Sequence, residues 1–162
     1  MAKSIAVKGD SVRGTDTHKV SGTLENGTTP YAGLGKYAYQ GSITEGLSDF
    51  VRINGVPVAL VTSGSTLDAG QTAPGPPPGG HAGPAGSDFV PAAPKPLATS
   101  LSILDTPLGG GTPGAGAGSK LLTIGGVKVL LDKDVIDTCS GLPTPGESKV
   151  SAQQQSLVAC SQ

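Results

Sequence analysis

Residues 50–61 read FVRINGVPVALV, and residues 121–132 read LLTIGGVKVLLD. Each stretch has an isoleucine, then a two-residue turn signal that ends in glycine, and then the pattern Val-x-Val-x-Leu. Asn-Gly is the strongest short signal for a two-residue β-hairpin turn, and Gly-Gly also allows the positive φ angles that such a turn requires. The two stretches therefore predict two copies of one β-hairpin, 71 residues apart.

The predicted turns also fix which residues face each other across the two strands. The expected pairs are Ile53–Val56, Val51–Val58 and Asp49–Leu60 in the first hairpin, and Ile124–Val127, Leu122–Val129 and Lys120–Leu131 in the second. Because cross-strand partners share one face of a sheet, each hairpin gathers five aliphatic side chains on one face. Turn type, register and apolar face recur together, so we interpret the pattern as a duplicated hairpin.

A weaker third copy lies at the N-terminus. When Asp10 is aligned with Asp134, Ile5 and Val7 take the places of the valine and the leucine that end the second copy. This third copy begins at its second strand, so its first strand must come from elsewhere in the chain. Residues 150–158 could supply that strand or form a short terminal helix, and their spacing is compatible with both.

The composition favours a small all-β domain. Glycine (26) and proline (14) make up about a quarter of the 162 residues, tryptophan is absent, and there are only three tyrosines and two phenylalanines. Such a chain is expected to have short strands, many turns and an additional stabilising device. Residues 97–104 could form another strand. We predict one domain over residues 1–162, with hairpin copies near 1–18, 46–68 and 118–139 and long Gly/Pro-rich loops at 70–87 and 107–119.

Charge and hydropathy exclude several classes of protein. The net charge is −1, so no basic surface points to nucleic acid, and no apolar run approaches the roughly 20 residues of a membrane span. The apolar stretch at the N-terminus is too short, and the segment too polar, for a signal peptide. Two cysteines are too few for a disulfide scaffold, which favours reduced thiols and synthesis in the cytoplasm.

Histidine and cysteine follow the hairpin copies in a regular way. His18 follows the N-terminal copy, His81 the middle copy and Cys139 the last copy, and Cys160 is the candidate for a fourth ligand. One imidazole or thiolate donor from each repeat would suit the tetrahedral N and S coordination of zinc. Solvated histidines, buried cysteines and a Cys139–Cys160 disulfide are the alternatives.

Catalysis has little support in the sequence. No nucleophile elbow, phosphate-binding loop or general base can be identified, and aspartates in glycine-rich turns usually accept hydrogen bonds from the turn itself. The four aspartates near the candidate metal are Asp10, Asp16, Asp134 and Asp137. We therefore expect a protein that is not an enzyme.

Three segments resemble one known family. Residues 46–59 read GLSDFVRINGVPVA, which resembles the repeating unit of PAAR-domain proteins, roughly GSPxVxINGKPAA, and residues 118–129 resemble the same unit. Residues 6–10, AVKGD, are similar to the family's opening AxxGD. This chain departs from the pattern at Ser63-Gly64, where the family has Gly-Asp, and it lacks the proline of the family unit.

The resemblance implies a small conical, pseudo-threefold arrangement of β-hairpins with zinc near its apex. It places the zinc ligands at His18, His81 and Cys139. Members of the family cap the trimeric β-helical spike (VgrG-like, or a phage hub or spike) of type VI secretion systems, phage tails and related particles. We thus expect a structural spike tip, made in the cytoplasm and assembled at the tip of an injected particle, with one chain per trimer at the cone base. The alternatives are an adaptor that docks cargo effectors and a small zinc hydrolase.

Overall fold

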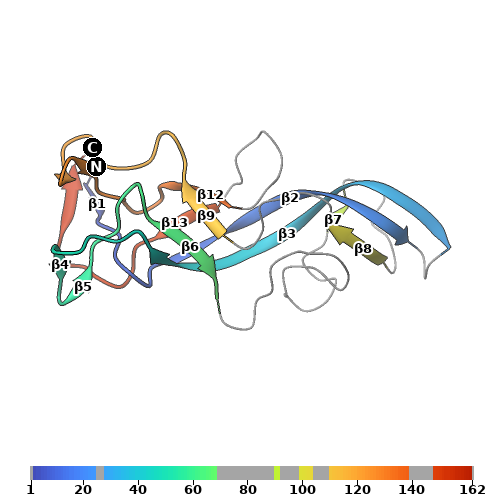
Figure 1. Ribbon diagram of the computed structural model, residues 1–162, viewed down its shortest axis with the longest axis horizontal. Helices are drawn as coiled ribbons and strands as arrows, with labels where there is room; N and C mark the ends of the chain where they lie inside the picture. Colours follow the sequence, from blue (N-terminus) through green and yellow to red (C-terminus); the bar gives the residue numbers. More distant parts are fainter. Residues whose placement is uncertain are drawn as a thin grey trace.

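The computed structural model describes residues 2–24, 28–68, 90–91, 99–103, 110–138 and 148–161, which form strands and turns and contain no helix (Figure 1). The all-β prediction is confirmed. The strands are β1 (Ala2–Ser4), β2 (Ser11–Leu24), β3 (Thr29–Glu45), β4 (Arg52–Ile53), β5 (Val56–Pro57), β6 (Gly64–Leu67), β7 (Val90–Pro91), β8 (Thr99–Ile103), β9 (Gly110–Pro113), β10 (Thr123–Ile124), β11 (Val127–Lys128), β12 (Val135–Thr138), β13 (Ser148–Ser151) and β14 (Ala159–Ser161).

Both predicted hairpins are present with the expected register. Strand β4 pairs with β5 and strand β10 pairs with β11, so that Ile53 faces Val56 and Ile124 faces Val127. All four turn residues have positive φ, as a two-residue hairpin turn demands: Asn54 51°, Gly55 78°, Gly125 58° and Gly126 82°.

A third hairpin joins the two ends of the chain. Strand β1 pairs with β14, with Lys3 opposite Cys160, and the two termini lie side by side in Figure 1. The C-terminal segment thus supplies the missing first strand of the N-terminal copy, and it is extended rather than helical. Strand β14 begins at Ala159, just after the predicted range 150–158. The start of that range belongs instead to β13 (Ser148–Ser151), which lies in a different sheet.

Beyond the hairpins, the three chain segments 5–7, 58–60 and 129–131 pair with one another in a closed triangle. The bridges are Ile5–Leu131, Val7–Val58 and Leu60–Val129. The backbone N–H of Ala6 donates to the carbonyl of Leu130 (2.9 Å), that of Leu130 to Ala59 (3.0 Å), and that of Ala59 back to Ala6 (2.9 Å). This ring of three hydrogen bonds relates the three segments by a pseudo-threefold axis.

The closed triangle corrects the outer pairs predicted for both hairpins. The pairings of Asp49 with Leu60 and of Lys120 with Leu131 are wrong, since Leu60 pairs with Val129 and Leu131 with Ile5. Each hairpin ladder ends where Val58 donates to the carbonyl of Val51, or Val129 to that of Leu122. After that point each strand pairs with the next repeat instead of its own hairpin partner.

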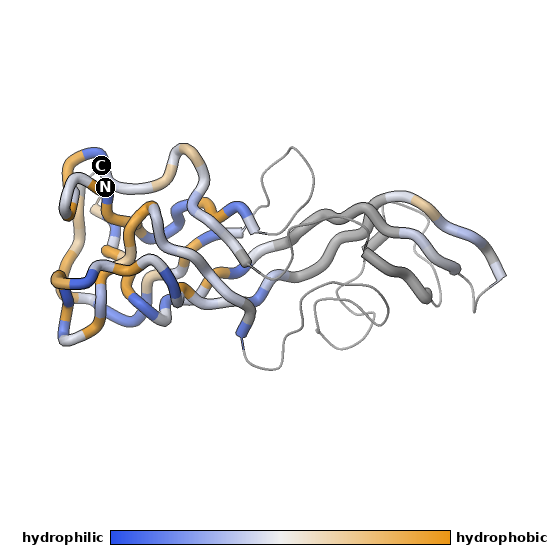
Figure 2. The backbone as a smooth tube through the Cα atoms, viewed as in Figure 1, coloured by the Kyte–Doolittle hydropathy of each residue, from blue (hydrophilic) through white to orange (hydrophobic). Residues whose placement is uncertain are grey.

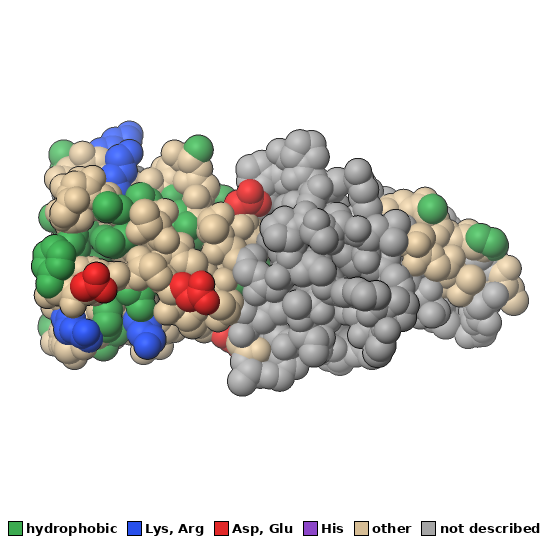
Figure 3. Space-filling view, in the orientation of Figure 1, with side chains coloured by type: hydrophobic (Ala, Val, Ile, Leu, Met, Phe, Trp, Pro, Cys, Tyr) green, Lys and Arg blue, Asp and Glu red, His purple; other side chains and the backbone are tan. Residues whose placement is uncertain are grey.

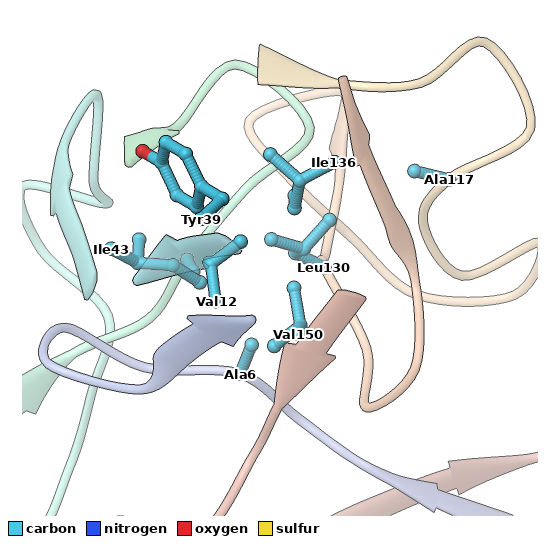
Figure 4. Packing of buried hydrophobic residues seen from close by; sticks show 9 residues of the cluster. Ala6, Val12, Tyr39, Ile43, Ala117, Leu130, Ile136 and Val150 are labelled. Carbon is cyan, nitrogen blue, oxygen red and sulfur yellow. The ribbon is translucent and has the colours of Figure 1, made fainter. Parts of the chain in front are cut away.

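Alternation along the triangle separates two apolar clusters. The outer residues of each segment lie under the hairpins, where hydrophobic residues gather along the backbone at one end of the molecule (Figure 2). The middle residues Ala6, Ala59 and Leu130 face the other way, into a second cluster. There Leu130 lies among Val12, Tyr39, Ile136 and Val150, which turn toward one another (Figure 4).

The second cluster fills a closed six-stranded barrel. Its strands follow in the order β2, β3, β6, β9, β12 and β13, and β13 pairs with β2 to close the ring. Each repeat contributes one strand before and one after its hairpin: β3 and β6, β9 and β12, β13 and β2. Closure leaves no unpaired strand edge in the barrel, which removes the usual template for edge-to-edge aggregation.

Strands β2 and β3 continue past the barrel as a long two-stranded arm. Their pairing runs from Ser11–Ser42 to Leu24–Thr29, and β8 and β7 flank the arm (Figure 1). Strand β8 confirms the strand predicted within residues 97–104. Within the predicted loop 107–119, Gly110–Pro113 form strand β9 of the barrel instead. The predicted loop at 70–87 lies outside the described residues.

Candidate docking surface

One polar side chain organises the approach to each hairpin. The backbone N–H of Ser48 donates to the carbonyl of Val58 (2.9 Å), and that of Ser119 donates to Val129 (2.8 Å). In the third repeat the side-chain amide nitrogen of Gln155 donates to Ile5 (2.8 Å). The oxygens of these three side chains then accept the backbone N–H groups that follow two or three residues later.

These contacts turn one large apolar side chain outward in each repeat. Phe50, Leu121 and Leu157 hold equivalent positions, two residues after Ser48, Ser119 and Gln155, and they are 73%, 70% and 69% exposed. We call these three residues the apolar triad. Half-exposed neighbours extend it at Leu122 and Val158. An exposed apolar group with threefold repetition is typical of an interaction surface rather than of scattered surface residues.

The apolar triad belongs to the hairpin end of the molecule, which we define as residues 2–9, 46–62, 118–133 and 153–161. Figure 3 shows hydrophobic side chains gathered at this end. Sequence reasoning missed the triad because it followed the face that each hairpin buries. The signal was present: both quoted stretches begin with a large apolar residue, Phe50 or Leu121, one position before the first residue of the predicted apolar face.

A second set of equivalent residues closes the turn after each triangle segment. Val7 N–H donates to Asp10 Oδ2 (2.7 Å), Leu60 N–H to Ser63 Oγ (2.8 Å), and Leu131 N–H to Asp134 Oδ2 (2.9 Å). All three acceptors are buried, with exposures of 0%, 2% and 5%. For Asp10 and Asp134 the predicted turn role is thus confirmed, and Ser63 makes the same contact at the equivalent position of the middle repeat.

The same side chains tie the turn to the segment that precedes the hairpin. Asp10 Oδ1 accepts the backbone N–H groups of Gln153 and Gln154 (both 2.8 Å), and Asp134 Oδ2 accepts that of Gly118 (2.8 Å). Ser63 differs, because its hydroxyl donates to the carbonyl of Gly46 (2.9 Å). Side chains that make two or three such bonds are structural, and they hold the docking surface on the barrel.

The predicted zinc ligands are only partly within the described residues. Cys160 lies in β14, where it takes the place of Ile53 and Ile124, packs against the cluster under the hairpins, and has its Sγ 3.2 Å from Ser119 Oγ. The backbone of His18 lies in β2 beyond the barrel, opposite Gly35, and its side chain lies outside the description. The structure does not bring His18 and Cys160 together.

The other two predicted ligands, His81 and Cys139, lie outside the described residues, as does the side chain of Asp16. Within the part of the chain that the structure describes, no three His, Cys, Asp or Glu side chains lie close enough to hold a metal ion. The described residues also contain no helix long and apolar enough to cross a membrane.

Comparisons with known proteins add no assignment, since no family model, curated protein or solved structure matches the chain.

Proposed function

We propose that this chain is a PAAR-like spike-tip protein that caps the trimeric spike of a contractile injection particle. The observation that carries the proposal is the apolar triad: one chain presents Phe50, Leu121 and Leu157 at equivalent positions around a pseudo-threefold axis. A homotrimer offers three identical contact sites around its own axis, so a single chain with three similar lobes can fit it. The hairpin end would face the spike, in the role of the cone base.

The rest of the fold suits a part that is pushed through an envelope. The triangle and the barrel are both closed rings of backbone hydrogen bonds, so a load along the axis does not meet a free strand edge. The arm of β2 and β3 extends from the barrel on the side away from the hairpins (Figure 1) and would form the leading end. We place the chain, on this proposal, at the tip of a secreted or injected particle and assign it no enzymatic activity.

Zinc is part of the proposal as a structural ion. His18, His81 and Cys139 offer the imidazole and thiolate donors that zinc prefers, and all three follow a hairpin copy in the sequence. Cys160, the fourth candidate, packs under the hairpins at the position of two isoleucines, which favours a packing role for this thiol.

The test of capping is the stoichiometry of a complex with a purified homotrimeric β-helical spike. We expect one chain per trimer in light scattering coupled to size exclusion. Replacing Phe50 and Leu121 by serine should abolish the complex without unfolding the chain, because both side chains are about 70% exposed. A complex of three chains with one trimer would contradict the proposal, since each chain would then use only one lobe.

An adaptor that docks cargo effectors is the second candidate. The arm favours it, because β7 and β8 widen the β2–β3 ribbon into a surface well separated from the hairpin end. A chain that lacks the arm but still caps the spike, while an effector is lost from the particle, would support the adaptor role.

A further inference from the structure

The charged residues are divided unevenly along the molecule. The hairpin end has six cationic and two anionic residues, an excess of four positive charges in a chain whose net charge is −1. The remainder of the chain therefore has an excess of five negative charges. The charged residues of the hairpin end are Lys3, Lys8, Arg52, Lys120, Lys128 and Lys133 on the positive side and Asp49 and Asp132 on the negative side.

Most of these cations face solvent, and two of them lie close in sequence to the apolar triad. All but Lys3 are exposed, and Lys3 lies 3.8 Å from Asp134. Lys120 directly precedes Leu121, and Arg52 follows Phe50 by two residues and donates to the carbonyl of Gly55 (3.1 Å) at the hairpin turn. Figure 3 shows Lys and Arg side chains among the hydrophobic ones at this end.

The carboxylate of Asp134 offsets the charge of Lys3, whose Nζ lies 3.8 Å away, and the carboxylates of Asp10 and Asp134 are otherwise used inside the turns. Both are buried, and both are directed at backbone N–H groups of the turns beneath the hairpin end. A partner that approaches the hairpin end therefore meets mainly positive side chains.

We propose, building on the capping function above, that the hairpin end docks on a homotrimeric protein end with an acidic rim. The apolar triad would contact the centre of that end, and the cations would meet aspartates and glutamates around it, the usual division between an apolar core and a polar rim. A homotrimer repeats each acidic group three times. Two of the three hairpins offer exposed cations, Arg52 in β4–β5 and Lys120 and Lys128 around β10–β11, whereas Lys3 in β1–β14 is partly buried and pairs with Asp134.

Other occupants fit the same surface less well. A second copy of this chain would bring two positively charged ends together, and like charges across an interface oppose association. A lipid surface gains nothing from a threefold arrangement of apolar residues. Nucleic acid would leave the exposed side chains of the apolar triad without an apolar contact.

The experiment uses the full chain and two purified probes. One probe is a homotrimeric β-helical spike with an acidic rim, and the other is the same spike with the rim Asp and Glu changed to Asn and Gln. Association rates are measured between about 0.05 M and about 0.5 M NaCl, a range over which surface charges become strongly screened. We expect the rate for the acidic spike to fall on the order of tenfold or more, and the neutralised spike to bind slowly at every salt concentration.

The repeat itself supplies the variant. The variant combines Arg52→Thr, Lys120→Ser and Lys128→Ser. Each change introduces the residue that another repeat has at the equivalent position, namely Thr123, Ser156 and Ser4, so the hairpins should keep their fold. The combined variant should lose the salt dependence toward the acidic spike. Lys149→Ser, at an exposed position of β13 on the barrel, is the matched control and should leave the rate unchanged.

The outcomes separate the two proposals. If one chain binds per trimer at a rate that is independent of salt, of rim charge and of the triple variant, the acidic rim is excluded and capping stands. If neither spike binds, both proposals fail. In that case, binding to vesicles of phosphatidylcholine and phosphatidylserine would assign the surface to anionic lipid, and self-association in sedimentation would assign it to a second copy.

Discussion

The side-chain amide of Gln155 takes the place that Ser119 fills with its backbone N–H and its hydroxyl. Its nitrogen donates to the carbonyl of Ile5, as the N–H of Ser119 donates to that of Val129. Its oxygen accepts two backbone N–H groups, at 3.0 and 2.9 Å, as the serine hydroxyl does at 3.1 and 3.0 Å. The third hairpin, assembled from both chain ends, is thereby held like a continuous one.

Gln155→Ala should consequently destabilise the third hairpin. The change leaves the carbonyl of Ile5 and the N–H groups of Leu157 and Val158 without these partners, and we expect a loss of about 2–3 kcal/mol in the free energy of unfolding. Denaturant unfolding measures it. Gln154→Ala is the matched control, because the side chain of Gln154 is exposed and only its backbone binds Asp10. Equal midpoints for the two variants would contradict the assigned role.

Ser63→Asp should destabilise the chain, although aspartate is the residue of the other two repeats. The hydroxyl of Ser63 donates to the carbonyl of Gly46, and a carboxylate would instead place negative charge against that oxygen in a buried turn. We expect a loss of about 2 kcal/mol or more, measured by thermal or denaturant unfolding. The reverse exchange, Asp10→Ser, should cost less than Asp10→Ala, because serine can still accept the N–H of Val7. A Ser63→Asp variant that is more stable than the parent chain would contradict the donor role assigned to the Ser63 hydroxyl.

The hairpins could be predicted because their signals are local. Asn54-Gly55 and Gly125-Gly126 fix turn and register within a few residues, and the structure keeps both. The third hairpin was harder to see from the sequence, since glutamine and serine perform the same role with different atoms. The pairs expected for Leu60 and Leu131 were wrong because a strand's partner after Val58 or Val129 is chosen by the other repeats and not by the turn.

The barrel is less visible in the sequence for a related reason. Strand β9 consists of Gly110, Gly111, Thr112 and Pro113, and its two glycines and its proline have low intrinsic strand preference, which is typical of a loop. Its strand character comes from pairing with β6 and β12, which are distant in sequence. Gly111 in particular is required by crowding, since an added Cβ would lie 2.6 Å from Ser65 Oγ and 2.7 Å from Thr138 Cγ2.

The three middle residues of the triangle are related by the pseudo-threefold axis, so we expect that a large side chain can be moved from one of these positions to another. Leu130 is the one large member beside Ala6 and Ala59, and all three are fully buried. Leu130→Ala should cost about 2–5 kcal/mol by leaving a cavity, and Ala59→Leu about 1–3 kcal/mol by overpacking. The double variant moves the leucine one step around the ring and should recover part of both losses. Denaturant unfolding of the two single variants and the double variant measures the coupling, and simple additivity would show that the three positions do not share one space.

Metal content tests the zinc proposal independently of docking. Elemental mass spectrometry of purified chain should find about one zinc per chain, and Cys139→Ser should lose the metal together with thermal stability, because structural zinc contributes folding free energy directly. Cys160→Ser is the matched control. Its thiol packs against the aliphatic cluster under the hairpins, so we expect this variant to keep its zinc and to lose only a small amount of packing free energy. If Cys160→Ser loses zinc and Cys139→Ser does not, Cys160 is a ligand. If the unsubstituted chain contains no zinc, the zinc proposal is wrong, and the proposed docking surface is unaffected.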